Sequence, residues 1–388
     1  MLKVVIDATA IQQKPSGVGL YVANLIYSLH PLQDQENFQL GISFQPRFKS
    51  WLRGNLSVPE LINQYNNIHI LPLPVKLSNL FVSLSPNPLI SNYFDRCFGH
   101  PDIIQGTNYS VYCCQNSKSI LNIYDLSFIK YPDYTDAVVK TYEKRLKHCL
   151  KWTDLVITIS ENSKQDIVKF LKVDPQKIYV TPLASRYYPE YLADKSTEQI
   201  INSTDYNFSN PYLLFVSTIE PRKNINALIS AFSYLKQNHK IDHHLVLIGQ
   251  KGWHYEPIFA AIEASPWQNQ IHHLNYLSDE LVALFYAKAD AFVYPSHYEG
   301  FGLPVLEAMT LGAPVITSNT SSLPEVAGDA ALFVNPDDSM QLAEAILQVI
   351  NDSKLRNELI QKGQERAKLF SWERTAKETI KAYQVLLT

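Results

Sequence analysis

The residues best suited to chemistry lie between positions 291 and 318, where two apolar runs enclose a glycine-containing loop. Glu299 precedes a predicted helix and Glu307 lies within its first turns, because Pro304 favours the start of a helix. Both carboxylates can therefore face one pocket, and free backbone amides at the helix start suit an anion. We expect a phosphate group to bind there, at Gly300, Phe301, Gly302 and Leu303. The pattern indicates a site for a sugar nucleotide.

A pair of cations follows another predicted strand. Arg222 and Lys223 come shortly after the apolar run Leu213–Ser217, and ligands of open α/β sheets bind at the carboxyl ends of the strands. Arg222 offers planar bidentate donors and Lys223 a compact charge, so the pair can neutralise a leaving diphosphate without a metal. Taken alone, the two residues are also consistent with an Arg-Lys pair that lies on the surface and binds no ligand.

The N-terminal segment contains a second possible phosphate site. Asp7 ends the first predicted strand, and Gly17 and Gly19 precede a helix, where glycine permits close approach of a phosphate to the backbone. Gly-x-Gly alone is a weak signal. It is neither a dinucleotide fingerprint nor a P-loop, because the third glycine, the acidic ribose contact and the Gly-Lys-Ser/Thr ending are missing.

Further strand ends carry polar residues that allow two interpretations. Tyr124 and Asp125 end one predicted strand, where Asp125 fits either a turn cap or a functional carboxylate. Ser160 ends another strand and is most simply a helix N-cap. Two later turns could line a nucleotide pocket, and their candidate residues are Gly249 in the turn at 249–253 and Leu277 in the turn at 275–279. An ordinary turn explains either segment equally well.

The apolar runs predict two doubly wound parallel α/β domains. Short apolar runs alternate with amphipathic segments over residues 1–185, and the alternation begins again over residues 212–370. Residues 186–211 are polar and rich in turn formers, so we predict a linker there, and residues 371–388 contain a final helical pattern. Other expected helices are Gly19–Leu29, Val138–Trp152, one from Glu161, Asn224–Leu235 and Tyr255–Ala264.

Composition narrows the class of protein. The chain has 388 residues, 18% of them charged, and no run of the ~20 apolar residues needed to cross a bilayer. Asp7 interrupts the N-terminal apolar run, which argues against a secretion signal, and we expect a cytoplasmic protein without a nucleic-acid partner. The cysteines lack metal-binding spacing and are expected to be reduced and structural: Cys97, Cys113, Cys114 and Cys149.

The formal charge of −3 is unevenly distributed, because residues 1–185 carry 18 Lys and Arg against 14 Asp and Glu. The predicted helix Val138–Trp152 places a row of lysines along one face: Lys140, Lys144, Lys147 and Lys151. Such a row suits peripheral contact with a lipid diphosphate or an anionic membrane, at its inner face. An ordinary solvated helix face is the alternative.

Through these segments the chain resembles the retaining nucleotide-sugar glycosyltransferases of family four, in particular bacterial mannosyl- and glucosyltransferases of polysaccharide assembly. Their fold is GT-B, with two facing Rossmann-like domains. The resemblance covers nearly the whole chain, and its motifs together are highly specific. They are SGVGLY at 16–21, YDLSFIKYP at 124–132, ITISENSKQDI at 157–167, STIEPRKN at 217–224, GQKGW at 249–253, YPSHYEGFGLPVLEA at 294–308 and SSLPEVAGDAA at 321–331.

The resemblance implies a role for each candidate. Glu299 and Glu307 form the E-x7-E motif, in which the first glutamate faces the donor sugar and the second holds the ribose. Arg222 and Lys223 bind the diphosphate, assisted by the amides of Gly17 and of the helix start. The donor would occupy the C-terminal domain and the acceptor the N-terminal domain, to which the last helix would cross back. The N-terminal domain contributes the catalytic candidate Asp125 and the acceptor-side candidates Asp7, Tyr124 and Ser160.

The chain departs from the family pattern at three places. Many members carry His-Asp where this chain has Tyr124-Asp125, so a histidine contact is not assumed. Many also carry Gly-Arg at the position of Val216-Ser217, and an arginine at the position of Leu20. Arg222 must then take over the contact with the phosphates, or that contact is weaker.

The sequence therefore predicts a retaining hexosyltransferase. The donor is a nucleoside diphosphate sugar of the GDP-mannose or UDP-glucose type, and the acceptor is a hydroxyl group of a saccharide or lipid-linked saccharide. We expect same-face displacement without a metal or other cofactor, with Glu299 orienting the sugar and the leaving phosphate taking the acceptor proton. The alternatives are a GT-B phosphorylase or epimerase, and a non-catalytic subunit that binds nucleotide sugar or acts as a scaffold.

Overall fold

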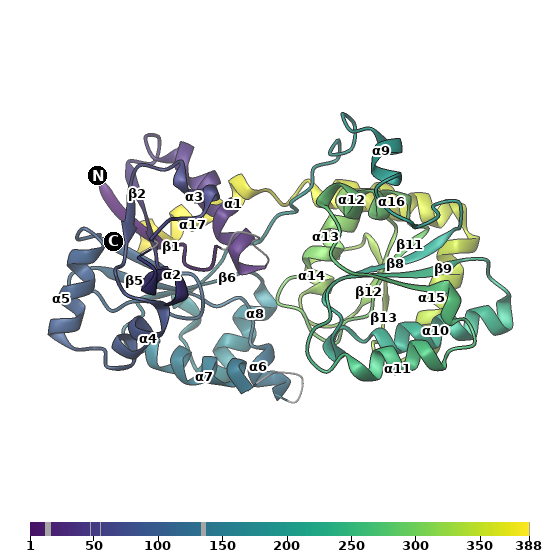
Figure 1. Ribbon diagram of the computed structural model, residues 1–388, viewed down its shortest axis with the longest axis horizontal. Coiled ribbons are helices and arrows are strands. Elements are labelled where there is room, and N and C mark those ends of the chain that lie inside the picture. Colours follow the sequence, from purple (N-terminus) through teal and green to yellow (C-terminus); the bar gives the residue numbers. More distant parts are fainter. Residues whose placement is uncertain (12–16, 47, 55, 133–136, 388) are drawn as a thin grey trace. The chain divides into compact units, whose positions relative to one another are not determined.

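The computed structural model describes residues 1–11, 17–46, 48–54, 56–132 and 137–387. The chain divides into two compact units, each built on its own β-sheet (Figure 1). The first unit comprises Met1–Lys130, Ala137–Leu183 and Trp372–Thr388, and the second comprises Tyr131–Asp136 and Ala184–Ser371. The donor and acceptor roles expected of the two parts stay predictions.

The first unit contains a seven-stranded parallel sheet in the order β3-β2-β1-β4-β5-β6-β7. Its strands are β1 Leu2–Asp7, β2 Phe38–Phe44, β3 Ile68–Ile70, β4 Ile103–Gly106, β5 Lys118–Asn122, β6 Leu155–Thr158 and β7 Ile178–Val180. Strand β6 is buried at every residue, as expected where helices cover both faces of a parallel sheet. The strand order reverses direction between β1 and β4, so the carboxyl ends of these strands form a topological switch point.

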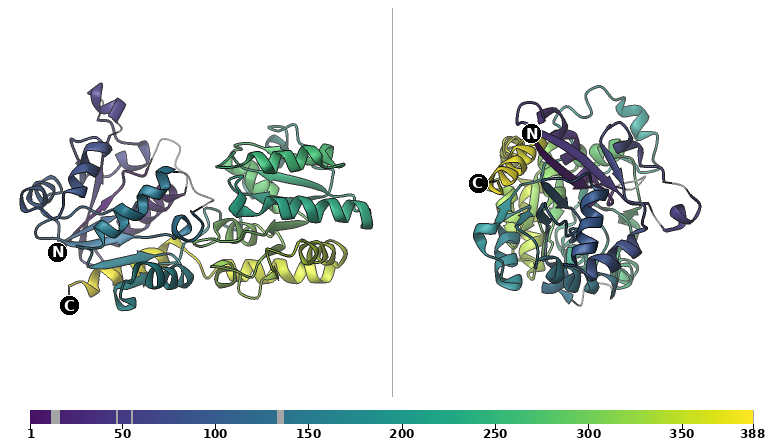
Figure 2. Two further views of the ribbon diagram at one scale, coloured as in Figure 1. Left: turned by 90° about the horizontal axis from the view of Figure 1, so that it is seen from below. Right: turned by 90° about the vertical axis from the view of Figure 1, so that its left-hand side faces the viewer.

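Helices surround the first sheet (Figure 2). They are α1 Val18–Leu29, α2 Phe48–Leu52, α3 Glu60–Asn63, α4 Val75–Ser83, α5 Pro88–Cys97, α6 Ser127–Lys130, α7 Ala137–Cys149, α8 Glu161–Asp166 and α17 Trp372–Val385. Helix α8 begins at the N-cap Ser160, whose hydroxyl accepts from the Ser163 amide, and it continues as a π-helical turn over Ile167–Leu171. The predicted N-cap role of Ser160 is therefore present.

The second unit contains a six-stranded parallel sheet in the order β10-β9-β8-β11-β12-β13. Its strands are β8 Tyr212–Val216, β9 His244–Ile248, β10 Ile271–Leu274, β11 Ala291–Tyr294, β12 Val315–Ser318 and β13 Ala331–Val334. This order is that of a Rossmann-type sheet, and its switch point lies between β8 and β11. The predicted fold class of two doubly wound parallel α/β sheets is confirmed.

Helices lie on both faces of the second sheet (Figure 2). They are α9 Thr197–Ile201, α10 Ile225–His239, α11 Glu256–Ala264, α12 Asp279–Lys288, α13 Leu303–Thr310, α14 Leu323–Ala327, α15 Ser339–Asn351 and α16 Ser353–Ala367. Helix α13 starts at Leu303 with Pro304 as its second residue, one position earlier than predicted. The other helix boundaries differ from the predicted ones by a few residues, as expected for helix ends.

Helix α17 belongs to the first unit, although it follows the whole second unit in sequence. In Figure 1 its yellow ribbon lies among the purple and blue elements of that unit, where it packs against α1. The ring centroids of Trp372 and Tyr21 lie 6.1 Å apart, and the Tyr383 hydroxyl donates to Gln105. The apolar face of α17 is thereby removed from water at Ala376, Ile380, Ala382 and Tyr383.

The residues 186–211, predicted as a linker, are structured and belong to the second unit. They include α9, and Tyr187 and Tyr206 are buried. Tyr206 packs against Phe285, with ring centroids 5.2 Å apart, and Tyr187 packs against Tyr286 at 6.3 Å. These tyrosines bind the segment to α12 without producing an apolar period in the sequence.

The structure also bears on the predictions for the cysteines, for the lysine row and for membrane-spanning segments. All four cysteines are described and none of them forms a disulfide. Lys144, Lys147 and Lys151 are exposed, and Lys147 pairs with Glu143 at 2.6 Å, whereas the side chain of Lys140 lies outside the described residues. In the part of the chain that the structure describes, no helix is both long and apolar enough to cross a membrane.

Candidate active site

The predicted cations and Glu299 meet at the switch point of the second sheet. The loop after β8 carries Arg222 and Lys223, and the loop after β11 carries Glu299. Strands β8 and β11 are paired neighbours, so their carboxyl ends bring the two loops together although the residues are 76 and 77 positions apart. This is the position at which open α/β sheets bind ligands.

The Glu299 carboxylate is held by donors on both oxygens. Its Oε1 atom accepts from Lys223 Nζ at 2.6 Å, from the Ser296 hydroxyl at 2.7 Å and from the Tyr294 hydroxyl at 2.9 Å. Its Oε2 atom lies 3.3 Å from Arg222 Nη1. The side chain therefore has a fixed position with its hydrogen-bonding capacity largely used.

Electrostatics keep Glu299 ionised. Burial alone would raise the pKa of this carboxyl, but Lys223 and Arg222 outweigh that effect and lower the pKa to about 2. Burial and the adjacent Arg222 lower the pKa of Lys223, and its contact with Glu299 opposes the change. A charge-assisted pair at 2.6 Å holds Lys223 as an ammonium ion beside an ionised carboxylate.

Arg222 is the more accessible of the two cations. Its side chain is 18% exposed, against 7% for Lys223. Arg222 Nη2 donates to Glu220 at 2.6 Å and Nη1 donates to the Tyr298 carbonyl oxygen at 2.6 Å. The guanidinium group is thus oriented by a carboxylate and a backbone carbonyl, while Lys223 lies deeper and contacts Glu299.

Short polar side chains hold the loop that carries Glu299. The Ser322 hydroxyl contacts the carbonyl oxygens of Glu299 and Phe301 at 2.9 and 2.7 Å, and the Ser296 hydroxyl lies 3.1 Å from the Arg222 carbonyl oxygen. Asn224 donates to the Pro295 carbonyl oxygen at 3.1 Å. The loops after β8 and β11 are therefore fastened to each other directly.

The start of α13 has the backbone geometry expected of a phosphate site. Gly302, its N-cap, has a φ of 110°, a conformation that other residues rarely adopt. A Cβ atom at this position would lie 2.9 Å from Leu323 Cδ2. Leu303 and Pro304 then continue as helix, which leaves the first amides of α13 without partners within the helix.

Glu307 has a separate set of partners. Arg186 Nε lies 2.9 Å from Glu307 Oε1, and the Tyr286 hydroxyl lies 3.3 Å from Oε2. Arg186 also pairs with Asp279 at 2.9 Å, which brings in the loop that contains Leu277. Burial raises the pKa of Glu307 above its usual value, and Arg186 opposes that rise.

Gly249 is required by the close approach of β8 and β9. A Cβ atom on Gly249 would lie only 1.9 Å from the carbonyl oxygen of Ser217. Beyond the two strands, Ile219 and Lys251 still form a parallel bridge, and the Ile219 amide donates to the Gln250 carbonyl oxygen at 2.8 Å. The GQKGW segment therefore supports the loop that leads to Arg222.

The acceptor-side candidates form a chain of hydrogen bonds at the switch point of the first sheet. The Thr107 hydroxyl donates to the Asp7 carbonyl oxygen at 2.6 Å, and the Tyr124 hydroxyl donates to the Thr107 carbonyl oxygen at 2.6 Å. Ser163 links the Tyr124 carbonyl oxygen, at 2.9 Å, to the Ser160 hydroxyl, at 3.0 Å. The structure thus brings Asp7, Tyr124 and Ser160 together.

Other candidates of the first unit have local roles as well. Asp125 accepts from the Ser127 amide at 2.9 Å, which fits the turn-cap interpretation. Gly17 is the N-cap of α1 with a φ of 49°, and Gly19 is buried in its first turn. Residues 12–16, which precede them and complete the predicted phosphate loop, lie outside the described residues. Burial raises the pKa of Asp7.

Several residues of the second-unit site are absent from the sequence-based predictions, and four of them show why. Arg186 contacts Glu307 across 121 positions, and its place in a polar segment gave no signal. Tyr286 lies in α12 and looks like an ordinary core residue. Glu220 and Ser296 are different. Each is a polar residue within one of the motifs at 217–224 and 294–308, and this position in a motif was a usable signal.

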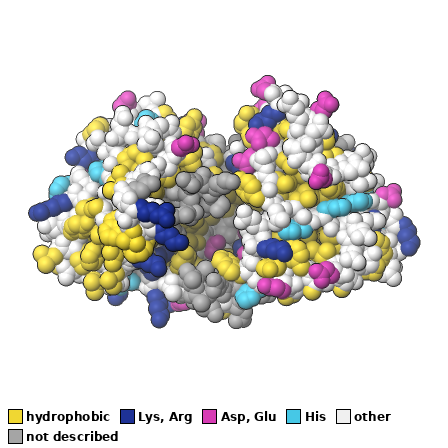
Figure 3. Space-filling model, in the orientation of Figure 1, with side chains coloured by type: hydrophobic (Ala, Val, Ile, Leu, Met, Phe, Trp, Pro, Cys, Tyr) yellow, Lys and Arg dark blue, Asp and Glu magenta, His cyan; other side chains and the backbone are white. Residues whose placement is uncertain are grey.

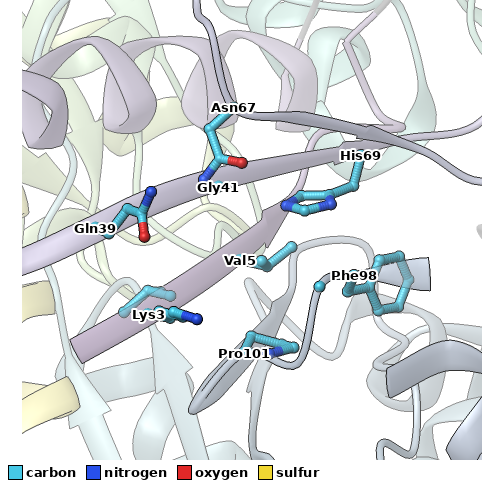
Figure 4. Close-up of a pocket in the computed structure, with 10 residues that line it drawn as sticks. Lys3, Val5, Gln39, Gly41, Asn67, His69, Phe98 and Pro101 are labelled. Atoms are coloured by element: carbon cyan, nitrogen blue, oxygen red, sulfur yellow. The ribbon is translucent and has the colours of Figure 1, made fainter. Parts of the chain in front are cut away.

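A pocket of about 220 Å³ lies elsewhere in the first unit (Figure 4). Lys3, Gln39 and His69 line it, and Gly41 leaves it open, because a Cβ there would lie 2.9 Å from Val5 Cγ2. No predicted site residue is among its lining residues. It adjoins the first half of β1, away from the carboxyl ends where sheets of this type bind ligands.

Known proteins resemble this chain in sequence. Residues 196–366 match the family model "Glycosyl transferases group 1". The O-antigen chain mannosyltransferase B of Escherichia coli is 35% identical over 271 residues, which cover 69% of this chain and 71% of that protein. The chain therefore belongs to the group 1 glycosyltransferases, and it is a hexosyltransferase that uses a nucleotide-sugar donor. The predicted family and enzyme class are confirmed.

Solved structures share the fold over nearly the entire chain. Sucrose-phosphate synthase from Thermosynechococcus elongatus has a TM-score of 0.75 at 19% identity, covering 100% of this chain and 99% of that one. Anabaena Alr3699/HepE in complex with UDP and glucose has a TM-score of 0.71 at 16% identity, covering 99% and 100%. The fold is GT-B, as predicted.

Proposed function

We propose that this chain transfers a mannosyl residue from a nucleoside diphosphate donor to a hydroxyl group of a growing saccharide, with retention at the anomeric carbon. One observation carries the proposal: Glu299 is ionised and fixed between Lys223 and Arg222 at the switch point of the second sheet. A sugar nucleotide needs hydroxyl acceptors and diphosphate donors side by side, and these loops combine them.

The identity of the sugar rests on a relative. The protein with 35% identity is named as an O-antigen chain mannosyltransferase, which favours mannose and, as its common activated form, GDP-mannose. The UDP and glucose complex belongs to a structure with 16% identity, which speaks for the fold alone. UDP-glucose is therefore the alternative donor, and its rate of sugar transfer has to be compared with that of GDP-mannose.

The geometry around Glu299 favours an orienting role for this carboxylate. Oε1 already accepts from Lys223, Tyr294 and Ser296, and Oε2 faces Arg222. A nucleophile would have to give up part of this stabilisation to form a bond with the anomeric carbon. We infer a same-face displacement in which the acceptor oxygen bonds to that carbon as the diphosphate leaves, and the leaving phosphate oxygen takes the acceptor proton.

The departing diphosphate gains negative charge, and in this proposal the Arg222 guanidinium group stabilises it. The side chain is partly exposed and oriented by Glu220, while the α13 amides near Gly302 supply further donors. Such preorganised donors are often the largest contribution to catalysis. Because these groups supply positive charge, the proposal includes transfer without a divalent metal.

The remaining roles follow from the two switch points. In this proposal Glu307 holds the donor ribose, and Gly249 and Leu277 lie beside the nucleotide. The first-unit residues Asp7 and Tyr124 would lie near the acceptor, which we take to be a saccharide or a lipid-linked saccharide. The assignments of Asp7, Tyr124, Gly249 and Leu277 rest on their positions at or just beyond the carboxyl ends of strands. That of Glu307 rests on its place in α13, the helix that follows the Glu299 loop.

The test is a transfer assay with GDP-mannose and UDP-glucose against a panel of saccharide acceptors, with and without EDTA. We expect mannosyl transfer that EDTA leaves unchanged, and an α-linked product by NMR. A β-linked product would exclude retention, and a mannosylated Glu299 peptide in mass spectra would exclude same-face displacement. Turnover with UDP-glucose alone would replace mannose by glucose in the proposal.

A further inference from the structure

Helix α4 exposes an apolar stripe in addition to the face that it buries. Leu77, Leu80 and Leu84 follow each other at helical spacing and are 41%, 54% and 57% exposed. Ser78 and Val82 face the interior instead and are almost completely buried. A surface helix normally places polar residues on its outer face, so three exposed leucines on and at the end of α4 require an explanation.

Helix α2 extends this apolar surface. Phe48 and Leu52 are 46% and 63% exposed, and the ring centroids of Phe48 and Trp51 are stacked at 6.2 Å. Trp51 Nε1 donates to the Pro72 carbonyl oxygen at 3.1 Å, which joins α2 to the segment that leads into α4. Figure 3 shows hydrophobic side chains gathered over these two helices.

The charges around these helices have one sign. Residues 45–94 contain four Lys and Arg and a single acidic residue, Glu60. Lys49 and Arg53 on or beside α2 and Lys76 on α4 are exposed, and Figure 3 shows Lys and Arg beside the hydrophobic side chains. We call Phe48, Leu52, Leu77, Leu80 and Leu84, with Lys49, Arg53 and Lys76, the α2–α4 surface.

We propose that the α2–α4 surface docks on an anionic lipid bilayer, with the leucines and Phe48 in the interfacial region and the three cations at the headgroups. Exposed apolar residues on a helix with cations beside them are the pattern of helices that lie in a membrane interface. Trp51 has the amphipathic ring that favours the same depth. The charge complementarity selects a bilayer with acidic headgroups over an uncharged one.

The lysine row of α7 does not provide the same combination. Lys144, Lys147 and Lys151 are exposed there, but Leu146 is buried and Tyr142 is only partly accessible. Among the α7 side chains that the structure describes, charge is therefore exposed without an apolar face beside it. The α2–α4 surface offers both, and it contains none of the residues that we assign to the sugar-transfer reaction, so its docking can be tested independently of that reaction.

The experiment is co-sedimentation of the full chain with vesicles of phosphatidylcholine alone or with 30% phosphatidylglycerol. We compare Leu80→Ser/Leu84→Ser with Leu369→Ser/Leu387→Ser, whose leucines are 50% and 55% exposed elsewhere on the protein. Lys49→Glu and Lys76→Glu are compared with Lys288→Glu, an exposed lysine at the end of α12. Circular dichroism and thermal unfolding establish that each variant folds.

We expect binding to the anionic vesicles that is several times stronger than to phosphatidylcholine alone. The leucine pair should lower the partition coefficient roughly tenfold, since each leucine loses partial apolar burial, and each lysine variant about fivefold. The control variants should bind like the wild type. Equal binding of surface and control variants overturns the proposal, as does a wild-type chain that stays unbound.

Analytical ultracentrifugation separates the other possible occupants. Self-association that Leu80→Ser/Leu84→Ser abolishes, without vesicle binding by the wild type, would assign this surface to a second copy of the chain and reject the bilayer. Transfer to a water-soluble acceptor should be the same in the leucine variants and the wild type. A loss of that transfer in folded variants would place the leucines in the reaction and contradict docking as their role.

Discussion

Glu299 carries its charge in a site that already supplies its counter-ions. Lys223 and Arg222 stabilise the carboxylate, and the hydroxyl groups of Tyr294 and Ser296 complete its contacts. In the proposed function, the donor sugar would meet a hydrogen-bond acceptor whose position and ionisation do not depend on the ligand. Such a site needs little reorganisation during the reaction, which is the physical basis of electrostatic preorganisation.

Replacement of Glu299 by glutamine tests this role directly. Glu299→Gln should lower kcat/KM roughly 100-fold or more. The neutral amide cannot balance the positive charges of Lys223 and Arg222, and its NH2 group donates hydrogen bonds where one carboxylate oxygen accepted them. The measurement is the initial rate of sugar transfer at donor concentrations below and above KM. Glu344→Gln, on the exposed side of α15, is the matched control. A variant at position 299 with wild-type kcat/KM would remove Glu299 from the reaction.

The depressed pKa of Glu299 also predicts how stability depends on pH. The folded pKa of about 2 lies below the usual value of 4.5, so the unfolded chain binds the extra proton between these values. The stabilisation, on the order of 3 kcal/mol, is complete above pH 4.5 and is lost as the pH falls toward 2. Denaturant unfolding should therefore show a stability gap between wild type and Glu299→Gln that is constant above pH 5.

The same gap should narrow as the pH falls from 4.5. Comparison of the two proteins cancels the contributions of the other carboxyl groups, Glu307 included, as long as the variant changes only position 299. A gap that stays the same down to pH 2.5 would show that Glu299 is not stabilised as an anion in the folded protein.

Arg186 should affect the donor more than the chemical step. Arg186→Gln leaves Glu307 buried without its cation, and loss of a hydrogen bond to a charged group costs ~1.5 kcal/mol or more. We expect KM for the donor to rise roughly tenfold while kcat changes little. Arg356→Gln is a suitable control, because both arginine side chains are about 30% exposed and each pairs with an aspartate. A change in kcat alone would contradict a role in donor binding.

At the scale of elements, α13 joins the two carboxylates to the proposed phosphate site. Its first residue follows Gly302, its middle carries Glu307, and the loop before it carries Glu299. Ser322 at the start of α14 ties that loop in place. A displacement of the α13 start should therefore disturb several donor contacts at once.

Two glycines at opposite ends of α13 allow a controlled test. Gly302 and Gly312 both have positive φ values, 110° and 81°, so alanine at either position should cost ~1–3 kcal/mol in backbone strain. A Cβ at Gly302 would also meet Leu323 at 2.9 Å, whereas at Gly312 the nearest atom is the flexible Gln364 amide at 3.2 Å. Gly302→Ala should weaken donor binding in calorimetry, and Gly312→Ala should only lower stability. Equal donor affinity in both would exclude the α13 start from the site.

The sequence predicted those elements whose pattern is local. Buried parallel strands such as β8 and β11 appear as short apolar runs, and glycine and proline mark the start of α13. The strands β2, β3, β4, β7 and β13 were not among the predicted ones, because their runs are short or interrupted by residues such as Gly41 and Gln105.

Prediction of the site ended where contacts join distant positions. Arg222, Lys223 and Glu299 could be found because each lies in a motif at a strand end. Arg186 could not, since nothing near it in sequence indicates a partner 121 residues away. The segment 186–211 was misleading for a related reason: Tyr187 and Tyr206 pack as isolated aromatic residues, which leave no periodic signal.

At the scale of the whole molecule, α17 makes the first unit depend on residues far along the chain. A stop after Ser371 should expose the apolar surface that Ala376, Ile380 and Tyr383 cover, at a cost of roughly 1.5–3 kcal/mol for each large apolar side chain. Hydrogen exchange should then show lost protection in β1, α1 and β4, while β8 to β13 keep theirs. A stop after Val385 is the control. Uniform loss across both units would contradict two separately stabilised parts.

The route of the chain also has a consequence for its synthesis on the ribosome. Residues 1–183 emerge first, yet the unit to which they belong also needs residues 372–388, which are made after residue 371. Domains generally fold as units while translation proceeds. The second unit can therefore finish folding while the first still waits for α17, and a nascent chain keeps the surface of α1 that will receive Trp372 uncovered until residues 372–388 have been made.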